Sequence, residues 1–384
     1  MALSKDIARP DKEELLEHVR KYRRDLHQIP ELELDLPKTQ AYVRQILSEL
    51  PCRLIEPIQS GVAAFFDNGK PDTIAFRSDM DALPVAEETG DAFQSKTPGC
   101  MHACGHDGHM AMLLGFAEVL ASYYQTLPHN VMLIFQPGEE NPGGAELICK
   151  TGFLTQYRIR HIFGFHLWPA LPAGTVATRK NEFMARSSEV NIDIFGRSVH
   201  AAKYKEGVDA LELGMRYLND VYAMERAIAP ETYRLLRFGH MQSGTIRNVV
   251  SGHTRLEGTL RAFQNDTYWF LRKQLEQLAK PFEAQGAKFV FDVNTGYPAV
   301  INDAALVDEA VQAMPSLQLL PDPEMISDDF AHYQQLLPGV YFFLGTGTGI
   351  PLHSSHFDFD ESILLKGIEM DEVLSHIPCR KEEK

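Results

Sequence analysis

Apolar side chains recur with a helical period over residues 12–28, which predicts an amphipathic helix there. Further along the chain, short apolar runs alternate with helical stretches. These runs are apolar on both faces, as strands are when helices cover both sides of their sheet. The clearest strand candidates are Thr73–Phe76, Val131–Phe135, Ile162–Phe165 and Val340–Leu344. The pattern predicts an α/β fold, a mixed sheet with helices on both faces.

A different order of elements occupies the middle of the chain. Residues 189–195 alternate between apolar and polar side chains, as a strand with one buried face does. The pattern then predicts a helix at 208–227, strands at 233–241 and 253–263, a helix at 267–285 and a strand at 288–294. The order β-α-β-β-α-β is the ferredoxin-like arrangement. We therefore predict a ferredoxin-like α+β domain at 186–297, inserted into an α/β domain made of 1–185 and 298–384.

Composition and charge narrow the possible partners and location. The 384 residues carry a formal net charge of −15, which argues against nucleic acid and anionic membranes as partners. No apolar run approaches the roughly 18 residues of a membrane span, and the first residues lack the apolar core of an export signal. The five cysteines are odd in number and show no pattern, so we expect reduced thiols and a cytoplasmic protein.

Acidic residues, histidines and a cysteine gather in five segments. The first, RSDMDALP, places Asp79 and Asp81 after a predicted strand, although a capped turn would explain both equally well. The second, MHACGHDGHM, is denser and contains His102, Cys104, His106, Asp107 and His109. A cysteine and a histidine two residues apart can bind one metal ion. The start of a helix here would favour the thiolate, and a polar helix start without a metal is the alternative.

The remaining segments lie further along the chain. FQPGEENPGGAE contains the adjacent acids Glu139 and Glu140, which repel each other unless a cation or a proton intervenes. One acid would then bind a metal while the other transfers protons, whereas solvated loop acids are the alternative. In GFHLWP, His166 ends a predicted strand and could equally be a core histidine. GTGTGIPLHSSHFDFDE places His353 and His356 in the loop after the last predicted strand.

The combination is more informative than any single segment. Four segments follow the carboxyl end of a predicted strand, and the remaining one, MHACGHDGHM, starts a helix. In an open α/β sheet this edge is where ligands bind. Thiolate, imidazole and carboxylate together suit zinc, manganese, cobalt or nickel, and they disfavour magnesium and calcium.

These motifs, in this order and spacing, resemble the dinuclear-metal amidohydrolases that include bacterial hippurate hydrolase, N-acetyl-diaminopimelate deacetylase and the plant auxin-conjugate hydrolases. The resemblance runs from RRDLHQIPEL to LHSSHFDFDE and includes QPGEE and GGAE. It implies two divalent metal ions per subunit, manganese or zinc with cobalt or nickel as further options. The implied metal ligands are Cys104, His106, Glu140, His166 and His353. It also implies Glu139 as the general base and an assisting aspartate that is either Asp79 or Asp81.

The resemblance further implies that the inserted domain is a lid, and that a homodimer or a larger homo-oligomer forms through it. In the lid, His200 would contact the developing oxyanion, and Asn248 and Arg261 would lie near the substrate carboxylate. Arg261 could instead be an ordinary surface residue on a strand. Two positions depart from the family pattern. KYKEG follows HAA where proline is common, and Asp328 stands where glutamate is common.

The implied activity is hydrolysis of the amide bond of a small N-acyl amino acid by a metal-activated water, with Glu139 as base. Deacetylation of N-acetyl-L,L-diaminopimelate is the more specific alternative, suggested by PGGAE and SGTIRNVVSGHTRLEGT. A cysteine nucleophile, Cys104 with a histidine, is a second mechanism. A third interpretation is not enzymatic: a binding or regulatory protein on a degenerate hydrolase scaffold, although every implied ligand is intact.

Overall fold

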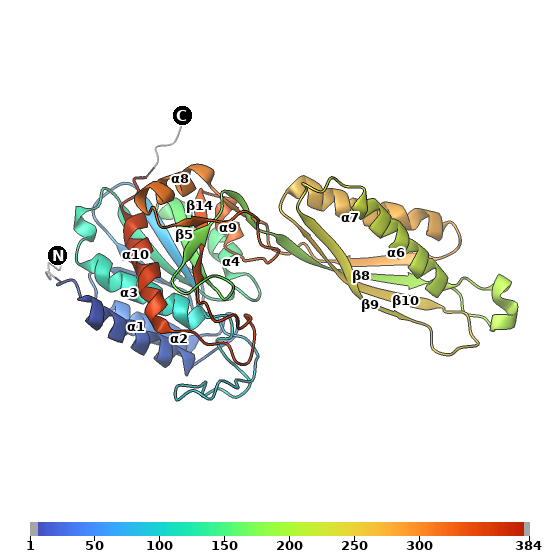
Figure 1. The fold of residues 1–384 in the computed structure, drawn as a ribbon, viewed down its shortest axis with the longest axis horizontal. Coiled ribbons are helices and arrows are strands. Elements are labelled where there is room, and N and C mark those ends of the chain that lie inside the picture. The colour runs from blue at the N-terminus through green and yellow to red at the C-terminus, as the bar shows by residue number, and fades with distance from the viewer. Residues whose placement is uncertain (1–6, 380–384) are drawn as a thin grey trace. The chain divides into compact units, whose positions relative to one another are not determined.

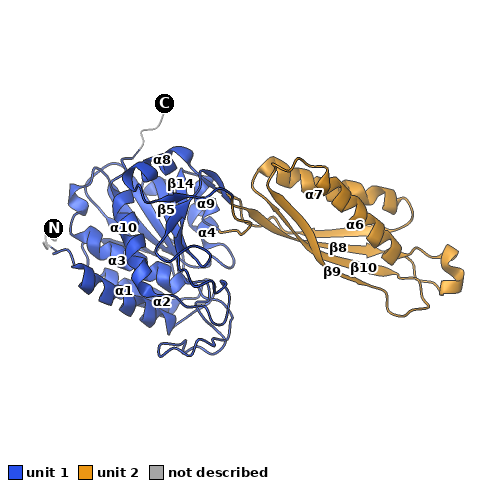
Figure 2. Cartoon of the chain, in the orientation of Figure 1, with its two compact units in different colours: residues 1–183, 301–322, 329–384 blue, residues 184–300, 323–328 orange. Residues whose placement is uncertain are grey.

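The computed structural model describes residues 7–379, which divide into two compact units (Figures 1 and 2). The first unit holds the chain up to residue 183, residues 301–322 and the chain from residue 329 onward. The second unit holds residues 184–300 and 323–328. The predicted α/β domain also included residues 1–6 and 380–384, which lie outside the described part of the chain.

An eight-stranded mixed sheet forms the centre of the first unit, in the order β1-β2-β4-β3-β5-β14-β6-β13. The neighbours β4, β3, β5 and β14 run parallel. The pairs β1–β2, β2–β4 and β14–β6 are antiparallel, and β13 is parallel to β6. The strands are β1 Arg53–Ile55, β2 Val62–Phe66, β3 Thr73–Asp79, β4 Asn130–Gln136, β5 Ile159–Trp168, β6 Val176–Thr178, β13 Gln318–Leu319 and β14 Gly339–Gly345. β7 Asn181–Met184 and β12 Val300–Asn302 form a separate two-stranded sheet.

Helices cover both faces of this sheet. On one face α3 packs directly on β3, where the rings of Phe116 and Phe76 are 4.9 Å apart, and α1 and α10 pack against α3. Side chains alternate along a strand, so Arg77 points to the opposite face, toward Tyr341. The helices are α1 Lys12–His27, α2 Pro37–Leu47, α3 His106–Ala121, α4 Gly144–Lys150, α5 Phe153–Gln156, α8 Ala304–Ala313, α9 Ala331–Gln334 and α10 Leu364–Ser375.

The second unit is a four-stranded antiparallel sheet, ordered β11-β8-β10-β9, with α6 and α7 on one of its faces (Figure 1). Its elements are β8 Arg186–Phe195, α6 Ala210–Arg226, β9 Arg234–Ser243, β10 His253–Ala262, α7 Asn265–Glu283 and β11 Lys288–Val293. Alternate residues of β8, namely Val190, Ile192 and Ile194, are fully buried in the core under the helices. A short 3-10 segment at Ala201–Glu206 follows β8.

The predicted fold class is confirmed in both parts, the mixed sheet with helices on both faces and the ferredoxin-like unit. The strands and helices that were named from the sequence agree with the structure to within a few residues, whereas β2, α2, α8 and α10 were not named. The two- and three-residue strands, such as β6 and β13, were missed because so short a segment has no measurable period. None of the helices in the described part of the chain has the length and apolar composition that crossing a bilayer requires.

A tight turn before α4 makes a stability prediction possible. A Cβ added at Gly144 would overlap the carbonyl oxygen of Pro137, a backbone atom that cannot move aside cheaply, and the Gly144 amide donates to the Gly138 carbonyl. Gly144→Ala should therefore lower the free energy of unfolding by about 2–4 kcal/mol, measured by urea unfolding. Gly239→Ala, where a Cβ meets nothing within 4 Å, is the control and should be nearly neutral. Equal effects of the two substitutions would contradict the steric argument.

Candidate metal centre

Four parallel strands bring their carboxyl ends to one edge of the large sheet, and the predicted site residues of the first unit lie there. Asp79 is the last residue of β3, and Glu139 and Glu140 lie in the loop after β4. His353 lies in the loop after β14. His166 was expected to end its strand, but β5 continues to Trp168 because its last two residues still pair with β14.

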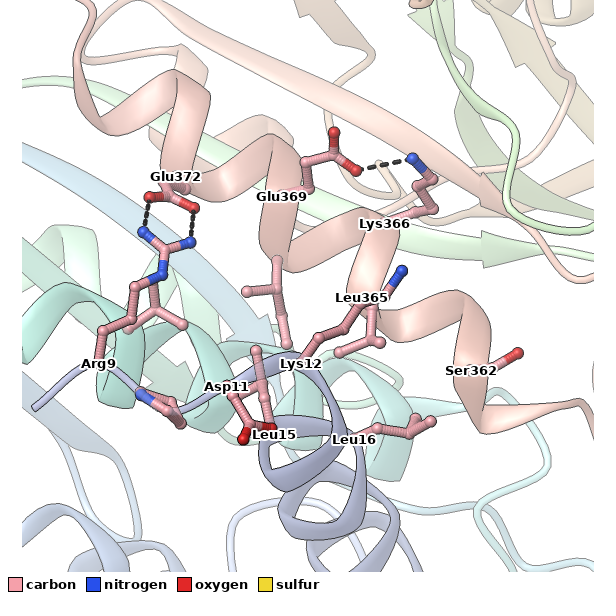
Figure 3. A pocket seen from close by; sticks show the side chains of 13 residues that line it. Arg9, Asp11, Lys12, Leu15, Leu16, Ser362, Leu365, Lys366, Glu369 and Glu372 are labelled. Atoms are coloured by element: carbon pink, nitrogen blue, oxygen red, sulfur yellow. Dashed lines mark hydrogen bonds and ion pairs between the residues drawn. The ribbon is translucent and has the colours of Figure 1, made fainter.

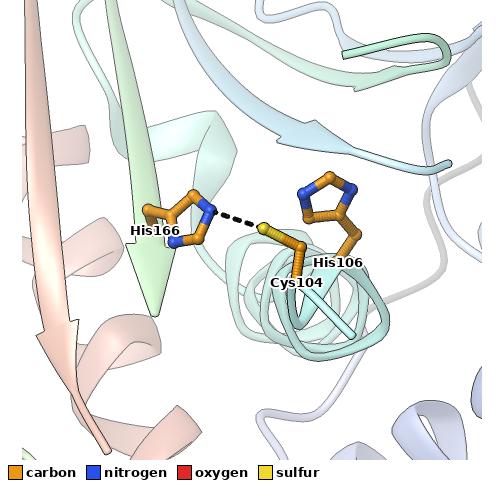
Figure 4. Close-up of side chains that lie close together, drawn as sticks. All are labelled: Cys104, His106 and His166. Carbon is orange, nitrogen blue, oxygen red and sulfur yellow. Dashed lines mark hydrogen bonds between the residues drawn. The ribbon is translucent and has the colours of Figure 1, made fainter. Parts of the chain in front are cut away.

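Cys104, His106 and His166 lie side by side at this edge (Figure 4). One potential ligand atom from each lies within 4.8 Å of the other two, and all three side chains are buried. His166 donates through Nδ1 to the Leu167 carbonyl oxygen at 2.7 Å, so its Nε2 carries the lone pair. The Cys104 thiol, 3.4 Å from that Nε2, is then the hydrogen-bond donor.

Glu140 and His353 extend the cluster. His353 Nε2 lies 3.3 Å from Glu140 Oε1, and both residues lie within 4.8 Å of Cys104 by their potential ligand atoms. The His353 amide donates to the Ala103 carbonyl at 2.9 Å, which fixes the loop after β14 beside Cys104. His353 also has a φ of 65°, a conformation that side chains other than glycine seldom adopt and that is commoner at functional sites.

The two candidate aspartates have different partners. Asp81 accepts from the backbone amides of both Glu139 and Glu140, at 2.9 and 3.0 Å, so it holds the adjacent glutamates in place. Asp79 instead accepts from Arg77 at 2.8 Å and from His109 at 2.7 Å. Both aspartates are fully buried.

The electrostatics around Cys104 favour neutral donors. Burial raises the pKa of the Cys104 thiol well above its usual range, and the charges of Glu140 and Glu139 raise it further. Burial lowers the pKa of His166 well below 6.5, and His109 beside it contributes to the shift. The thiol therefore keeps its proton at neutral pH, while the His166 imidazole is unprotonated at the nitrogen that faces it.

The residues present fit a site for a transition metal. His106 donates through Nδ1 to the Asp81 backbone carbonyl at 2.7 Å, which leaves Nε2 as a buried lone pair. Within residues 7–379 that Nε2 has no hydrogen-bond partner. An unpaired buried nitrogen costs free energy unless something binds it, and sulfur, nitrogen and carboxylate donors together suit zinc or manganese.

A buried network behind His106 was not recognised from the sequence. Asp107 accepts from Arg23 at 3.0 Å and from His27 at 2.8 Å, and His27 Nε2 lies 3.3 Å from Glu87. The available signal was that Arg23 and His27 lie four residues apart, beside the apolar stripe of the first helix. His102 is also buried in this region, and burial lowers its pKa to about 3, so it is neutral.

The predicted substrate residues lie in the second unit. His200 and Asn248 are exposed neighbours, since the amide after His200 donates to the Asn248 carbonyl at 2.9 Å. Arg261 lies apart from this pair on β10, partly buried, where its guanidinium donates to the Met325 carbonyl oxygen of the same unit. His356 of the fifth segment is exposed and hydrogen-bonds to Ser355 at 2.9 Å.

A hollow of about 770 Å³ lies elsewhere on the first unit, between α1 and α10 (Figure 3). Its floor is apolar, and the cations Arg9 and Lys366 on its rim already pair with Glu372 and Glu369. No predicted site residue lines it. The candidate site residues of the first unit therefore lie at the sheet edge and not in this hollow.

Comparison with known proteins places this arrangement in a class of enzymes, the metal-dependent hydrolases. The chain belongs to peptidase family M20/M25/M40, which it matches over residues 75–374.

Three relatives illustrate the match. An uncharacterized hydrolase of Staphylococcus haemolyticus is 35% identical over 370 residues, 91% of this chain and 95% of the relative. The YxeP protein of Bacillus subtilis, a dinuclear metal-binding peptidase of family M20, superposes with a TM-score of 0.84 at 29% identity, over 95% of this chain and 98% of its own. An aminobenzoyl-glutamate utilization protein of Klebsiella pneumoniae shares the fold, with a TM-score of 0.63 at 21% identity over 94% and 96% of the two chains.

The His27–Asp107 pair makes stability depend on pH. Burial alone would lower the pKa of His27, but the charge of Asp107 and the hydrogen bonds that His27 donates to Asp107 and Glu87 outweigh it and raise the pKa to about 9. A raised folded-state pKa stabilises the fold fully below the unfolded value of about 6.5, and the contribution disappears as the pH rises through 9. The free energy of unfolding of the wild type should then exceed that of His27→Asn by on the order of 3 kcal/mol at pH 6.

Urea unfolding from pH 6 to pH 9.5 measures this difference. The asparagine keeps a donor toward Asp107 but cannot carry the charge, so the difference between the two proteins should shrink steadily toward pH 9.5. A difference that stays constant or grows with pH would show that His27 is not held as a cation.

Proposed function

We propose that this protein hydrolyses the amide bond of N-acyl amino acids, with Glu139 as the general base. The observation that supports the proposal is the convergence of five potential ligands at one sheet edge, next to a buried glutamate that can move a proton. The five are Cys104, His106, Glu140, His166 and His353. The family match supports hydrolysis, and the substrate class is our inference from the sequence motifs.

Two divalent ions, manganese or zinc with cobalt or nickel as further options, would lower the pKa of a water molecule and polarise the amide carbonyl when bound. The side chains have separate tasks. Glu139 accepts the proton of the water and later delivers it to the leaving amine. Asp81 keeps Glu139 and Glu140 in register through their two amides, so the base and its neighbouring ligand cannot move independently. We therefore assign the assisting role to Asp81.

Recognition of the substrate is assigned to the second unit. We propose that His200 stabilises the oxyanion, and that Asn248 and Arg261 contact the substrate carboxylate. The hydrogen bond from Arg261 to the Met325 carbonyl leaves other guanidinium donors available. We also propose a homodimer or larger homo-oligomer that forms through this unit, and a cytoplasmic enzyme whose partner is a small molecule.

One contact favours a different mechanism, a Cys104–His166 nucleophilic pair, because the thiol lies 3.4 Å from Nε2. A nucleophilic cysteine needs a lowered pKa, however, and burial raises the pKa of Cys104. A nucleophilic pair would also leave Glu140 and His353 without a role. The metal mechanism accounts for all of these residues.

A panel of N-acyl amino acids tests the proposal, with acetyl, benzoyl and longer acyl groups and with N-acetyl-L,L-diaminopimelate as the more specific alternative. We expect the manganese- or zinc-loaded protein to release free amino acid from at least one of them. A chelator should abolish the activity and added metal should restore it. Activity that survives complete metal removal would favour the cysteine nucleophile, and no release from any member would refute the substrate class.

Substitutions of Glu139 and Glu140 should have different effects. Glu139→Gln removes the proton acceptor and leaves the ligands intact, so it should keep its metal and lose kcat by about 10²-fold or more. Glu140→Gln removes a ligand and should lower metal occupancy, measured by elemental analysis after dialysis. Glu146→Gln changes a partly exposed glutamate on α4 that pairs with Lys150; it is the matched control and should change neither property. Equal metal occupancy in the Glu139 and Glu140 variants would contradict the division of roles.

A further inference from the structure

His109 lies in the dense histidine motif but has no place in the proposed ligand set. It lies on α3 three residues after His106 and is 2% exposed. Its Nε2 lies 2.9 Å from the backbone nitrogen of Leu167, and its Nδ1 lies 2.7 Å from Asp79 Oδ1. A backbone N–H can only donate, so Nε2 accepts and Nδ1 carries the proton that Asp79 accepts. Both ring nitrogens are thus occupied, and His109 cannot bind a metal ion without breaking one of these bonds.

The bond from Leu167 fixes the strand at the residue that holds His166. The carbonyl of Leu167 accepts from His166 Nδ1 at 2.7 Å and so sets the direction in which Nε2 points. The amide of the same residue is bound by His109. The ring of His109 also packs edge-on against His166, with centroids 4.7 Å apart. The orientation of His166 therefore depends on where His109 holds the Leu167 peptide.

The packing around Leu167 shows how closely the helix approaches the strand. A Cβ added at Gly105 would lie 2.8 Å from Leu167 Cδ1, and one at Gly108 would lie 3.0 Å from the same atom. A larger residue at either position would require the Leu167 side chain or the start of α3 to move. The two glycines permit the approach, and the His109 bond to the Leu167 amide determines its register.

Asp79 anchors the other side of His109. Its second oxygen accepts from Arg77 at 2.8 Å, and Arg77 in turn binds Asp329 at 2.7 Å on the opposite face of the sheet. Asp79 therefore cannot follow His109 if the helix shifts. The bonds connect β3, α3 and β5 in series, from Asp79 through His109 to the Leu167 amide.

We propose that His109 is a positioning residue that aligns the two halves of the metal centre. It holds the α3 half, with Cys104 and His106, against the β5 half, with His166. Of its two bonds, the one to the Leu167 amide orients His166, and the one to Asp79 keeps the His109 ring in place. The inference rests on the proposed metal centre, but not on which substrate is cleaved.

Three substitutions separate the two bonds. In His109→Asn the amide nitrogen falls where Nδ1 lies, so the bond to Asp79 is kept and the acceptor for Leu167 is lost. In His109→Gln the amide oxygen reaches the place of Nε2, so the acceptor for Leu167 is kept. His109→Phe keeps the ring and neither bond. His129→Phe is the matched control, a buried histidine before β4, at the amino end of the parallel strands, whose Nε2 contacts the Ser375 carbonyl at 2.9 Å.

The measurements use metal alone, without substrate. Zn²⁺ affinity is obtained by competition with a chromophoric chelator, and the Co²⁺ form is examined for its thiolate charge-transfer and ligand-field absorption. His109→Phe should weaken Zn²⁺ binding roughly 10- to 100-fold and change the Co²⁺ spectrum, while the number of ions bound at saturation stays the same. His109→Gln should recover most of the affinity and the spectrum, and His109→Asn should recover less. His129→Phe should leave both unchanged.

Several results would overturn the proposal. A smaller number of bound ions in His109→Phe would make His109 a ligand. If His109→Asn restores Zn²⁺ affinity better than His109→Gln, the bond to Asp79 and not the bond to the Leu167 amide orients His166. If all three variants have wild-type affinity and spectrum, His109 has no positioning role. If His109→Phe does not fold, the comparison of glutamine with asparagine still decides. Failure of the acyl substrate panel would refute the proposed reaction and leave these metal measurements unaffected.

Discussion

The parallel alignment of β4, β3, β5 and β14 is the constraint on which the candidate site depends. Parallel strands end on the same edge, so residues far apart in the sequence, such as Glu140 and His353, lie within reach of each other. Those two residues also belong to loops, which can move. Each loop is held by a hydrogen bond next to a regular element. Asp81, two residues after β3, accepts from the Glu140 amide, and the Ala103 carbonyl, three residues before α3, accepts from the His353 amide.

This arrangement places many polar groups where water cannot reach them, and each needs a partner. Removing one member of a buried ion pair costs about 3–5 kcal/mol because the other charge is left unpaired. On one face of the sheet Asp107 is held between Arg23 and His27, and on the other face Arg77 lies between Asp79 and Asp329. Asp107 directly follows the proposed ligand His106 in the chain, and Asp79 Oδ2 lies 3.7 Å from His106 Nε2. The arginines therefore pair with buried carboxylates beside His106 and are themselves outside the proposed ligand set.

Much of the fold could be predicted from the sequence because its long elements have clear periods. The edge of the sheet could also be predicted, since acids and histidines follow apolar runs such as Val131–Phe135. The end of β5 could not, because a polar His166 looks like the end of a strand and the pairing of Trp168 with β14 is invisible in the sequence.

Asp79 and Asp81 present the same difficulty at the site. They belong to one motif, two residues apart, and only their contacts distinguish them. One is bound by an arginine and a histidine, and the other by the amides of two glutamates. His109 received no role from its place in the dense motif, and its contacts with Asp79 and the Leu167 amide are visible only in the structure.

Metal binding at the proposed site depends on the protonation of its donor atoms. Burial raises the pKa of the Cys104 thiol, which lies 3.4 Å from His166 Nε2. A metal ion binds thiolate, so its entry must release the thiol proton. Burial thus has two opposing effects on the same residue: it makes the thiolate a strong ligand once formed, and it delays its formation until a cation arrives to replace the proton.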